Sequence, residues 1–196
     1  MVKPKKDNVP QLLDKLFKTI SGNRFIKREG LGGNKPIFIQ PYEISQQVIV
    51  DEQIHSLIKR LNAAGVPVLS IDLFGMCLEI LKKKGTLEKI LQNEQNISKR
   101  EFKRSFQGSL SVKDTIMPFI QSKMAETEHQ IVFIYGIDKV FPFLSIVPIL
   151  EDIQIVLNNE PFVFFYPGYY NNYSLNFLGC IIEDDEYRAF NLNNYN

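Results

Sequence analysis

Short apolar runs alternate along this chain with longer segments of helical character. The helical segments are 9–20, 48–64, 73–84, 86–94, 98–107, 113–127 and 143–157. Runs rich in β-branched and aromatic residues occupy 36–40, 66–71, 130–135 and 162–166. Strands that alternate with helical crossovers are typical of a parallel sheet covered on both faces. The pattern therefore predicts an α/β fold with a mainly parallel central sheet of about four to five strands and helices on both faces.

Proline, glycine and asparagine set the expected ends of these elements. Pro167-Gly168 is expected to stop the last strand at residue 166, because proline lacks an N–H to donate to a neighbouring strand. The Asn-rich end of the chain is expected to fray. Because no linker or repeat interrupts the pattern, we predict a single α/β domain over 8–192, with a basic tail at 1–7 and a C-terminal tail at 193–196.

The composition narrows the class of protein. A hydrophobic content of 44% and a charged content of 23% are typical of a globular protein and exclude a disordered chain. The N-terminus lacks the apolar run of a signal peptide, and no apolar stretch approaches the roughly 20 residues of a membrane-spanning helix. We therefore expect a cytoplasmic protein, a monomer or weak dimer without membrane contact.

The charge pattern leaves two interpretations. The formal net charge of +1 gives the whole molecule no field that favours nucleic acid. Basic residues nevertheless gather near the N-terminus, at 82–84 and at 99–104. Solvated helix surfaces are the favoured interpretation, so direct nucleic-acid binding is not expected. DNA contact through 82–104 remains the alternative.

Candidate ligand residues follow the predicted strands, because ligands of parallel α/β sheets gather at the carboxyl ends of the strands. Asp72 and Asp138 each follow such a strand and could bind a metal or a nucleotide at one edge. The run 131–138 has the pattern of a Walker-B strand, which fits a degenerate ATPase-like sensing domain. The alternative for Asp72 is that it caps the helix that begins at Leu73.

The other requirements of catalysis are missing from the sequence. The glycine-rich stretch 30–33 precedes its strand, whereas a phosphate-binding Walker-A loop follows one, so a Rossmann-like or degenerate P-loop-like core would lack that loop. Cys77 and Cys180 are isolated, and the spacing of His55 and His129 does not suit zinc. We therefore predict no catalytic residues, no metal and no cofactor.

Aromatic residues gather after the third and fourth predicted strands and form a candidate partner-binding surface. They are Phe141, Phe143, Tyr166, Tyr169 and Tyr170. Tyrosine beside asparagine and glycine offers amphipathic contact area of the kind found at protein interfaces. The alternative is that these rings close the core. Residues 161–179 contain no Lys or Arg, which disfavours nucleic acid at this surface.

Several short motifs, in order and over residues 10–192, resemble the BrxB family of BREX bacteriophage-exclusion systems. They are Phe25-x-x-Arg28-Glu29-Gly30-Leu31-Gly32, Pro36-Ile-Phe-Ile-x-Pro41-Tyr42, Val132-Phe-Ile-Tyr-Gly136, Val140-Phe-Pro-Phe143, Pro167-Gly168-x-Tyr170 and Tyr187-Arg188-Ala189-Phe190. Among the residues of these motifs, we single out as structural or interface residues Arg28, Glu29, Gly30, Pro142, Pro167, Gly168, Arg188 and Phe190.

The resemblance implies a biological setting that the composition does not. It implies an accessory protein or adaptor in anti-phage defence, with no known catalytic activity. Such a protein would act beside a large ATPase, a methyltransferase and the alkaline-phosphatase-like protein PglZ. PglZ is the partner we expect, and the BREX ATPase or methyltransferase is the alternative. None of the motif residues makes an acid–base pair or a set of metal ligands. This agrees with the prediction, made from the residues alone, that the protein has no catalytic residues and no metal.

Overall fold

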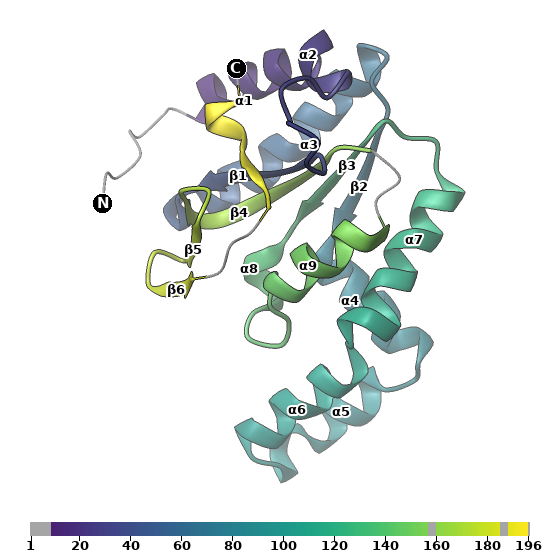
Figure 1. Cartoon of the computed structure of the whole chain (residues 1–196). Coiled ribbons are helices and arrows are strands. Elements are labelled where there is room, and N and C mark those ends of the chain that lie inside the picture. The colour runs from purple at the N-terminus through teal and green to yellow at the C-terminus, as the bar shows by residue number, and fades with distance from the viewer. Residues whose placement is uncertain (1–8, 157–159, 185–187, 196) are drawn as a thin grey trace.

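A central twisted sheet organises the chain in the computed structural model, which describes residues 9–156, 160–184 and 188–195, without the side chains of 9–11, 156, 183 and 184. Within these ranges, seven strands join in one sheet with the order β2-β3-β4-β1-β7, and β5 and β6 branch from β4 (Figure 1). The strands are β1 (Ile37–Tyr42), β2 (Val68–Asp72), β3 (Ile131–Tyr135), β4 (Phe162–Tyr170), β5 (Ser174–Phe177), β6 (Ile181–Asp184) and β7 (Phe190–Asn191).

The main part of the sheet is parallel. β1 pairs in parallel with β4 and β7, and β3 pairs in parallel with β2 and β4. All four predicted strands are found, and the α/β class is confirmed. The sheet is only partly parallel, however, because β5 and β6 pair antiparallel to their neighbours. The finer assignment to a Rossmann-like or P-loop-like core is not confirmed.

Helices cover both faces of this sheet. They are α1 (Val9–Ile20), α2 (Asn23–Ile26), α3 (Gln47–Ala63), α4 (Leu73–Lys83), α5 (Leu87–Asn93), α6 (Lys99–Ser109), α7 (Met117–Glu126), α8 (Ile137–Val140) and α9 (Val147–Val156). None of them is long and apolar enough to cross a membrane. α1 and α3 pack with one face, and α4, α7, α8 and α9 pack with the other. The connection from β1 to β2 crosses the sheet in the opposite direction to the connections from β2 to β3 and from β3 to β4. Because all crossovers between parallel strands share the right-handed sense, the first connection places its helix on the opposite face.

Alternation of side chains along the strands divides the core into two clusters. In β4, Phe162, Phe164 and Tyr166 join the cluster under α4, α7 and α9, whereas Val163 and Phe165 join the cluster under α1 and α3. The same period of two recurs in β1 and β3. All five residues of β3 are buried. This double coverage explains why the sequence of the strands is continuously apolar.

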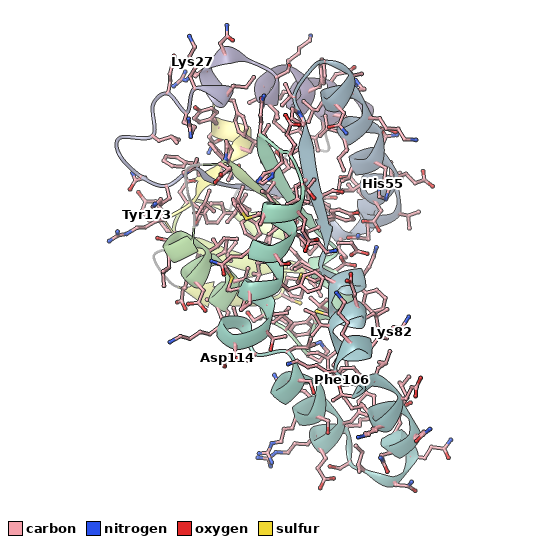
Figure 2. All side chains as sticks on the ribbon, turned by 90° about the vertical axis from the view of Figure 1, so that its right-hand side faces the viewer. Lys27, His55, Lys82, Phe106, Asp114 and Tyr173 are labelled. Atoms are coloured by element: carbon pink, nitrogen blue, oxygen red, sulfur yellow. The ribbon has the colours of Figure 1, made fainter. Side chains whose placement is uncertain are left out.

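A pair of short helices, α5 and α6, projects from the body of the molecule (Figures 1 and 2). α6 begins with a capping box, in which the Glu101 backbone N–H donates to the Ser98 hydroxyl and the Ser98 N–H donates to the Glu101 carboxylate. The predicted helix over 113–127 is found as a π-helical turn, Val112–Ile116, followed by α7. α6 is joined to the body through Phe106, whose ring lies 4.6 Å from that of Phe143.

The expectation that Pro167-Gly168 ends the fourth strand is wrong, because β4 continues through both residues to Tyr170. The carbonyl of Pro167 accepts from the Leu178 N–H at 2.9 Å, on the side of β5. The N–H and C=O of one strand residue point to the same side, so the missing donor leaves the pairing with β1 intact. Gly168 then allows the strands to approach, since a β carbon there would lie 2.1 Å from the Asn176 carbonyl oxygen.

The end of the chain is also packed, so the expectation of fraying is wrong for residues 190–195. Phe190 and Asn191 form β7 beside β1, and a 3₁₀ turn follows over Leu192–Asn194. The Asn191 side chain donates to the Tyr170 carbonyl at 2.6 Å. The buried Tyr195 hydroxyl donates to the Glu29 carbonyl at 2.6 Å. Asparagine here supplies specific hydrogen bonds between strands.

We predict that Gly168→Ala destabilises the protein by about 2 kcal/mol or more, because the new methyl group meets backbone at a φ of +145°. Gly108→Ala is the matched control, because this glycine lies inside α6 and a β carbon there meets nothing within 4 Å. Its replacement should stabilise the helix by about 0.5–1 kcal/mol. Urea denaturation of both variants measures the difference. Equal stabilities would contradict the close approach of β4 and β5.

Candidate functional site

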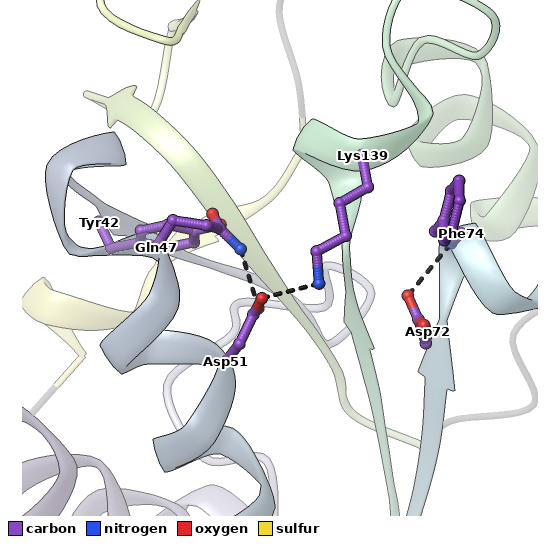
Figure 3. A network of polar contacts seen from close by, with 6 residues as sticks. All are labelled: Tyr42, Gln47, Asp51, Asp72, Phe74 and Lys139. Atoms are coloured by element: carbon purple, nitrogen blue, oxygen red, sulfur yellow. Dashed lines mark hydrogen bonds and ion pairs between the residues drawn. The ribbon is translucent and has the colours of Figure 1, made fainter.

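The carboxyl ends of β1, β2 and β3 place a set of polar side chains along one edge of the sheet (Figure 3). β1 ends at Tyr42, β2 ends at Asp72, and β3 is followed by Gly136 and the short helix α8. Because these strands are parallel, their carboxyl ends lie on the same side. We call this edge, with the segments that directly follow β1, β2 and β3, the carboxyl rim.

A chain of hydrogen bonds connects three elements of the carboxyl rim. The Tyr42 hydroxyl donates to the side-chain carbonyl of Gln47, whose Nε2 donates to Asp51 at 2.8 Å. Lys139 forms an ion pair with the other oxygen of Asp51, with 2.7 Å between Nζ and Oδ2. The network therefore links β1, α3 and α8 (Figure 3). Sequence reasoning missed Gln47, Asp51 and Lys139; the spacing of Gln47 and Asp51 by four residues was the available signal.

Asp72 acts as the cap of α4, which confirms that interpretation of the sequence. Its Oδ1 accepts from the Phe74 N–H at 3.1 Å. The same oxygen packs against Gly136, where a β carbon would lie only 2.3 Å away. Gly136 has a φ of +73°, so both its conformation and its neighbour require glycine. Asp72 is thus held by the contacts that join β2 to the turn after β3.

Asp138 lies beside this network with an unfavourable charge. Burial raises the pKa of its carboxyl, and the negative charge of Asp51 raises this pKa further. Its Oδ1 is buried and has no hydrogen-bond partner among the described residues. Lys139 is held charged: burial lowers its pKa, but the Asp51 hydrogen bond and the charges of Asp51, Asp72 and Asp138 raise it overall. Asp72 and Asp138 both lie at the carboxyl rim, as the sequence predicted, and a ligand-binding role for them stays a prediction.

The chemistry of this edge is that of charge pairing. Burial raises the pKa of the Tyr42 hydroxyl, so it remains a neutral donor at neutral pH. Burial, with the charge of Asp72, raises the pKa of the Cys77 thiol to about 12, which keeps it protonated. No group of three His, Cys, Asp or Glu residues suited to a metal occurs within the described part of the chain. The glycine turn at 30–33 lies at the opposite, amino end of β1.

The predicted aromatic surface is largely inside the protein. Tyr166 is fully buried, and Tyr170 is buried with its hydroxyl donating to the Ala189 carbonyl at 2.8 Å. This burial argues against partner binding by these two tyrosines and favours the alternative that they close the core. Tyr169 and Phe143 are half-buried, and Phe143 packs on Phe106. The sequence could not reveal this, because the β5–β6 hairpin that follows β4 was not predicted.

Five exposed apolar side chains lie instead on segments at the carboxyl rim. Phe141 is 42% exposed and follows α8, while Phe74 is 42% exposed and begins α4. The segment after β1 adds three more, namely Ile44, Val48 and Ile49. Each of these five side chains belongs to a segment that directly follows β1, β2 or β3. Of the five predicted partner-binding residues, only Phe141 lies among them.

Several of the motif residues have structural roles in this fold. Gly30 has a φ of +81° and faces the Arg24 guanidinium, and Arg28 also has a positive φ of 58°. The Glu29 carbonyl binds Tyr195, and the Phe190 ring packs 5.8 Å from that of Phe38.

The remaining motif residues differ in exposure. Pro142 is exposed and follows a cis peptide bond. Arg188 is also exposed. Tyr187 of the same motif lies outside the described ranges. An interface role for Arg28, Glu29, Gly30, Pro142, Pro167, Gly168, Arg188 and Phe190 stays a prediction.

The fold and the carboxyl rim together define a mixed α/β protein that carries a polar network and exposed apolar side chains at the carboxyl ends of its strands. The family model described as "BREX protein BrxB" matches residues 69–192. A BREX protein BrxB of Bacillus cereus is 30% identical over 94% of this chain and 97% of its own length. A BREX protein BrxB of Escherichia coli is 26% identical over 92% of this chain and 89% of its own length.

The chain belongs to the BrxB family, and members of this family are components of BREX systems. This confirms the resemblance seen in the sequence motifs. No solved structure matches the chain.

We predict that Asp138→Asn raises the melting temperature at pH 7. The pKa of Asp138 is higher in the folded than in the unfolded state, so folding is favoured when this group is protonated. That contribution is complete below the unfolded pKa and is lost as pH rises through the folded pKa. The stabilisation by asparagine should therefore shrink as the pH falls towards 4. Thermal melts at several pH values measure it.

Glu52→Gln provides the matched control, because Glu52 is an exposed carboxylate on α3. A melting temperature of Asp138→Asn that differs from the wild type by the same amount at every pH would show that the charge of Asp138 is not the cause.

Proposed function

We propose that the protein is a non-catalytic accessory component of a BREX anti-phage defence complex, and that it binds another protein of the system through the carboxyl rim. PglZ is the partner that we propose to test first. The family membership supports the setting, and the position of five exposed apolar side chains on segments at one edge of the sheet supports a binding surface there. Single exposed apolar residues are ordinary, whereas a group at one edge is typical of an interaction site.

Phe141 has the properties of an interface anchor. Its ring is exposed to 42%, yet it lies 5.0 Å from the ring of Phe177, so part of its surface is already fixed against the body. An aromatic side chain held in place before binding loses little conformational entropy when a partner covers it. Phe74 occupies a similar position at the start of α4.

The polar network supports the same surface. Protein interfaces combine apolar side chains with polar, solvent-accessible groups, and the carboxyl rim carries both kinds. The Asp51–Lys139 ion pair lies on the carboxyl rim, where the Asp51 side chain is 25% exposed and that of Lys139 is 38% exposed. The pair fixes α8 relative to α3 and thereby holds the segment that carries Phe141.

We predict that the double variant Phe74→Ala, Phe141→Ala weakens binding to PglZ about thirtyfold or more, because truncation of a buried aromatic anchor typically costs 2 kcal/mol or more. Co-purification with tagged PglZ from cells that carry the whole defence locus, followed by titration of the purified pair, measures the loss. Because both rings are already partly exposed in the free protein, the melting temperature should change little.

Ile155→Ala is the matched control. Ile155 is 81% exposed near the end of α9, which leads to the amino end of β4 and hence to the opposite edge of the sheet. It should bind PglZ as the wild type does. Failure of the wild type to retain PglZ would refute the choice of partner. Wild-type affinity in the double variant would refute the carboxyl rim as the binding surface.

A further inference from the structure

The positive charge of this chain is concentrated in one segment. Residues 82–109 contain eight Lys and Arg and three Glu, which gives a net charge of +5, whereas the whole chain carries +1. The rest of the chain therefore carries −4. Residues 82–109 include the end of α4, all of α5 and all of α6, and we call them the basic arm. A nearly neutral protein thus contains a strongly basic part joined to an acidic body.

The arm projects from the body of the molecule, and its charges face outward. In Figure 2, the projecting helices, one of which carries Phe106, lie beyond Lys82 at one end of the protein. Phe102 and Phe106 turn one side of α6 towards Phe143. Arg100 and Arg104 are four residues apart, lie on the opposite side of the helix and are exposed. Helical geometry therefore separates the anchoring side of α6 from its charged side.

The outward charges are not neutralised within the described part of the protein. No described residue forms an ion pair with Lys99, Arg100, Lys103 or Arg104. The nearest acid in sequence, Glu101, is engaged in the capping box of α6, where the hydrogen bonds from Ser98 lower its pKa and the charge of Arg104 adds to this effect without an ion pair. Lys84 and Lys83 differ, because Lys84 donates to Ser109 and Thr115 and Lys83 pairs with Glu79. The hydrogen bonds of Lys84 tie the base of the arm together. The basic residues without an ion-pair partner among the described residues are therefore mainly those of α6.

An open groove separates α5 from α6. The groove between α5 and α6 has a volume of about 360 Å³ and is lined by Lys89, Asn93, Ile97 and Ser105, among others. Lys89 is exposed and contributes a further ammonium group to this side of the arm. Because α5 also carries Glu88, the net positive charge of the two helices is that of α6.

We propose that the basic arm binds the phosphate backbone of double-stranded DNA through the outer face of α6. Phosphate contacts need only Lys, Arg and hydrogen-bond donors, which this face supplies. An α-helix of about 10–12 Å diameter also fits the major groove of about 12 Å width. The interaction is independent of base sequence and adds a function to the protein binding proposed for the carboxyl rim.

The composition of the arm distinguishes this ligand from two others. Single-stranded nucleic acid is bound on exposed aromatic rings, but the rings of the arm, Phe102 and Phe106, are packed against Phe143. The cores of protein interfaces are depleted in charged residues and particularly in lysine, although arginine is enriched there. The outer face of α6 instead carries Arg100 and Arg104, flanked by Lys99 and the partly buried Lys103, with no large apolar side chain exposed between them. Duplex phosphate is therefore the ligand that this face fits best.

The test measures binding of a short fluorescent DNA duplex by anisotropy over a range of salt concentrations. We expect the logarithm of the wild-type association constant to fall linearly with the logarithm of salt concentration. The double variant Arg100→Gln, Arg104→Gln should reduce this slope by about 2 and weaken binding at least tenfold at about 0.1 M salt. Glutamine is a good helix former, so α6 should persist.

Lys27→Gln, Lys59→Gln is the matched control, because both lysines are exposed and lie outside the arm. It lowers the net charge by the same two units, from +1 to −1. It should bind the duplex with the wild-type slope. Equal losses in both double variants would overturn the assignment to α6. So would the absence of wild-type binding at low salt, tighter binding of single strands, or equally tight binding of poly-glutamate.

This test is independent of the partner proposed above. The Arg100→Gln, Arg104→Gln variant should retain PglZ as the wild type does, because neither arginine belongs to the carboxyl rim. Loss of DNA binding with PglZ retained supports the two surfaces separately. Loss of both together would overturn the proposal that α6 acts through phosphate contacts alone.

Discussion

Burial of β1, β3 and β4 on both faces is the constraint on which the rest of this structure depends. A strand that is covered on both sides offers almost no accessible polar side chain along its length. The five residues of β3 are all buried, and the one amide of β1, Gln40, is itself buried and donates to the Asn193 side chain. Polar groups and ligand-accessible surface are therefore confined to the ends of the strands and to elements outside the sheet. The two surfaces proposed here, the carboxyl rim and the basic arm, are places of these two kinds.

The carboxyl rim is held by interactions that cross the sheet from one face to the other. α3 covers one face and α8 belongs to the other, and the Asp51–Lys139 ion pair joins them at the edge. The contact of Asp72 with Gly136 joins β2 to the turn after β3 in the same region. An exposed ion pair contributes little to stability by itself. It nevertheless joins α3 to α8, the helix that directly precedes Phe141.

Local patterns in the sequence predicted what local physics determines. The apolar runs identified the four main strands, and the acid before Leu73 was correctly interpreted as a cap. The course of β4 through Pro167 was not predictable, because it depends on β5, which lies on the side where the proline lacks its donor. The burial of Tyr166 depends on the same hairpin, and that of Tyr195 depends on a turn some 160 residues earlier in the chain. These features arise from pairings between distant segments, which no short motif encodes.

The segment 141–143 connects the two proposed surfaces and decides which variants can separate them. Phe141 contributes to the carboxyl rim, whereas Phe143, two residues later, receives Phe106 of the basic arm at 4.6 Å. Truncation of Phe143 would loosen the anchor of α6 and disturb its neighbour at the same time, so its effects on a protein partner and on DNA could not be told apart. Phe74 and Phe141 on one side, and Arg100 and Arg104 on the other, avoid this shared anchor. Variants of these residues can therefore test the two proposed binding surfaces separately.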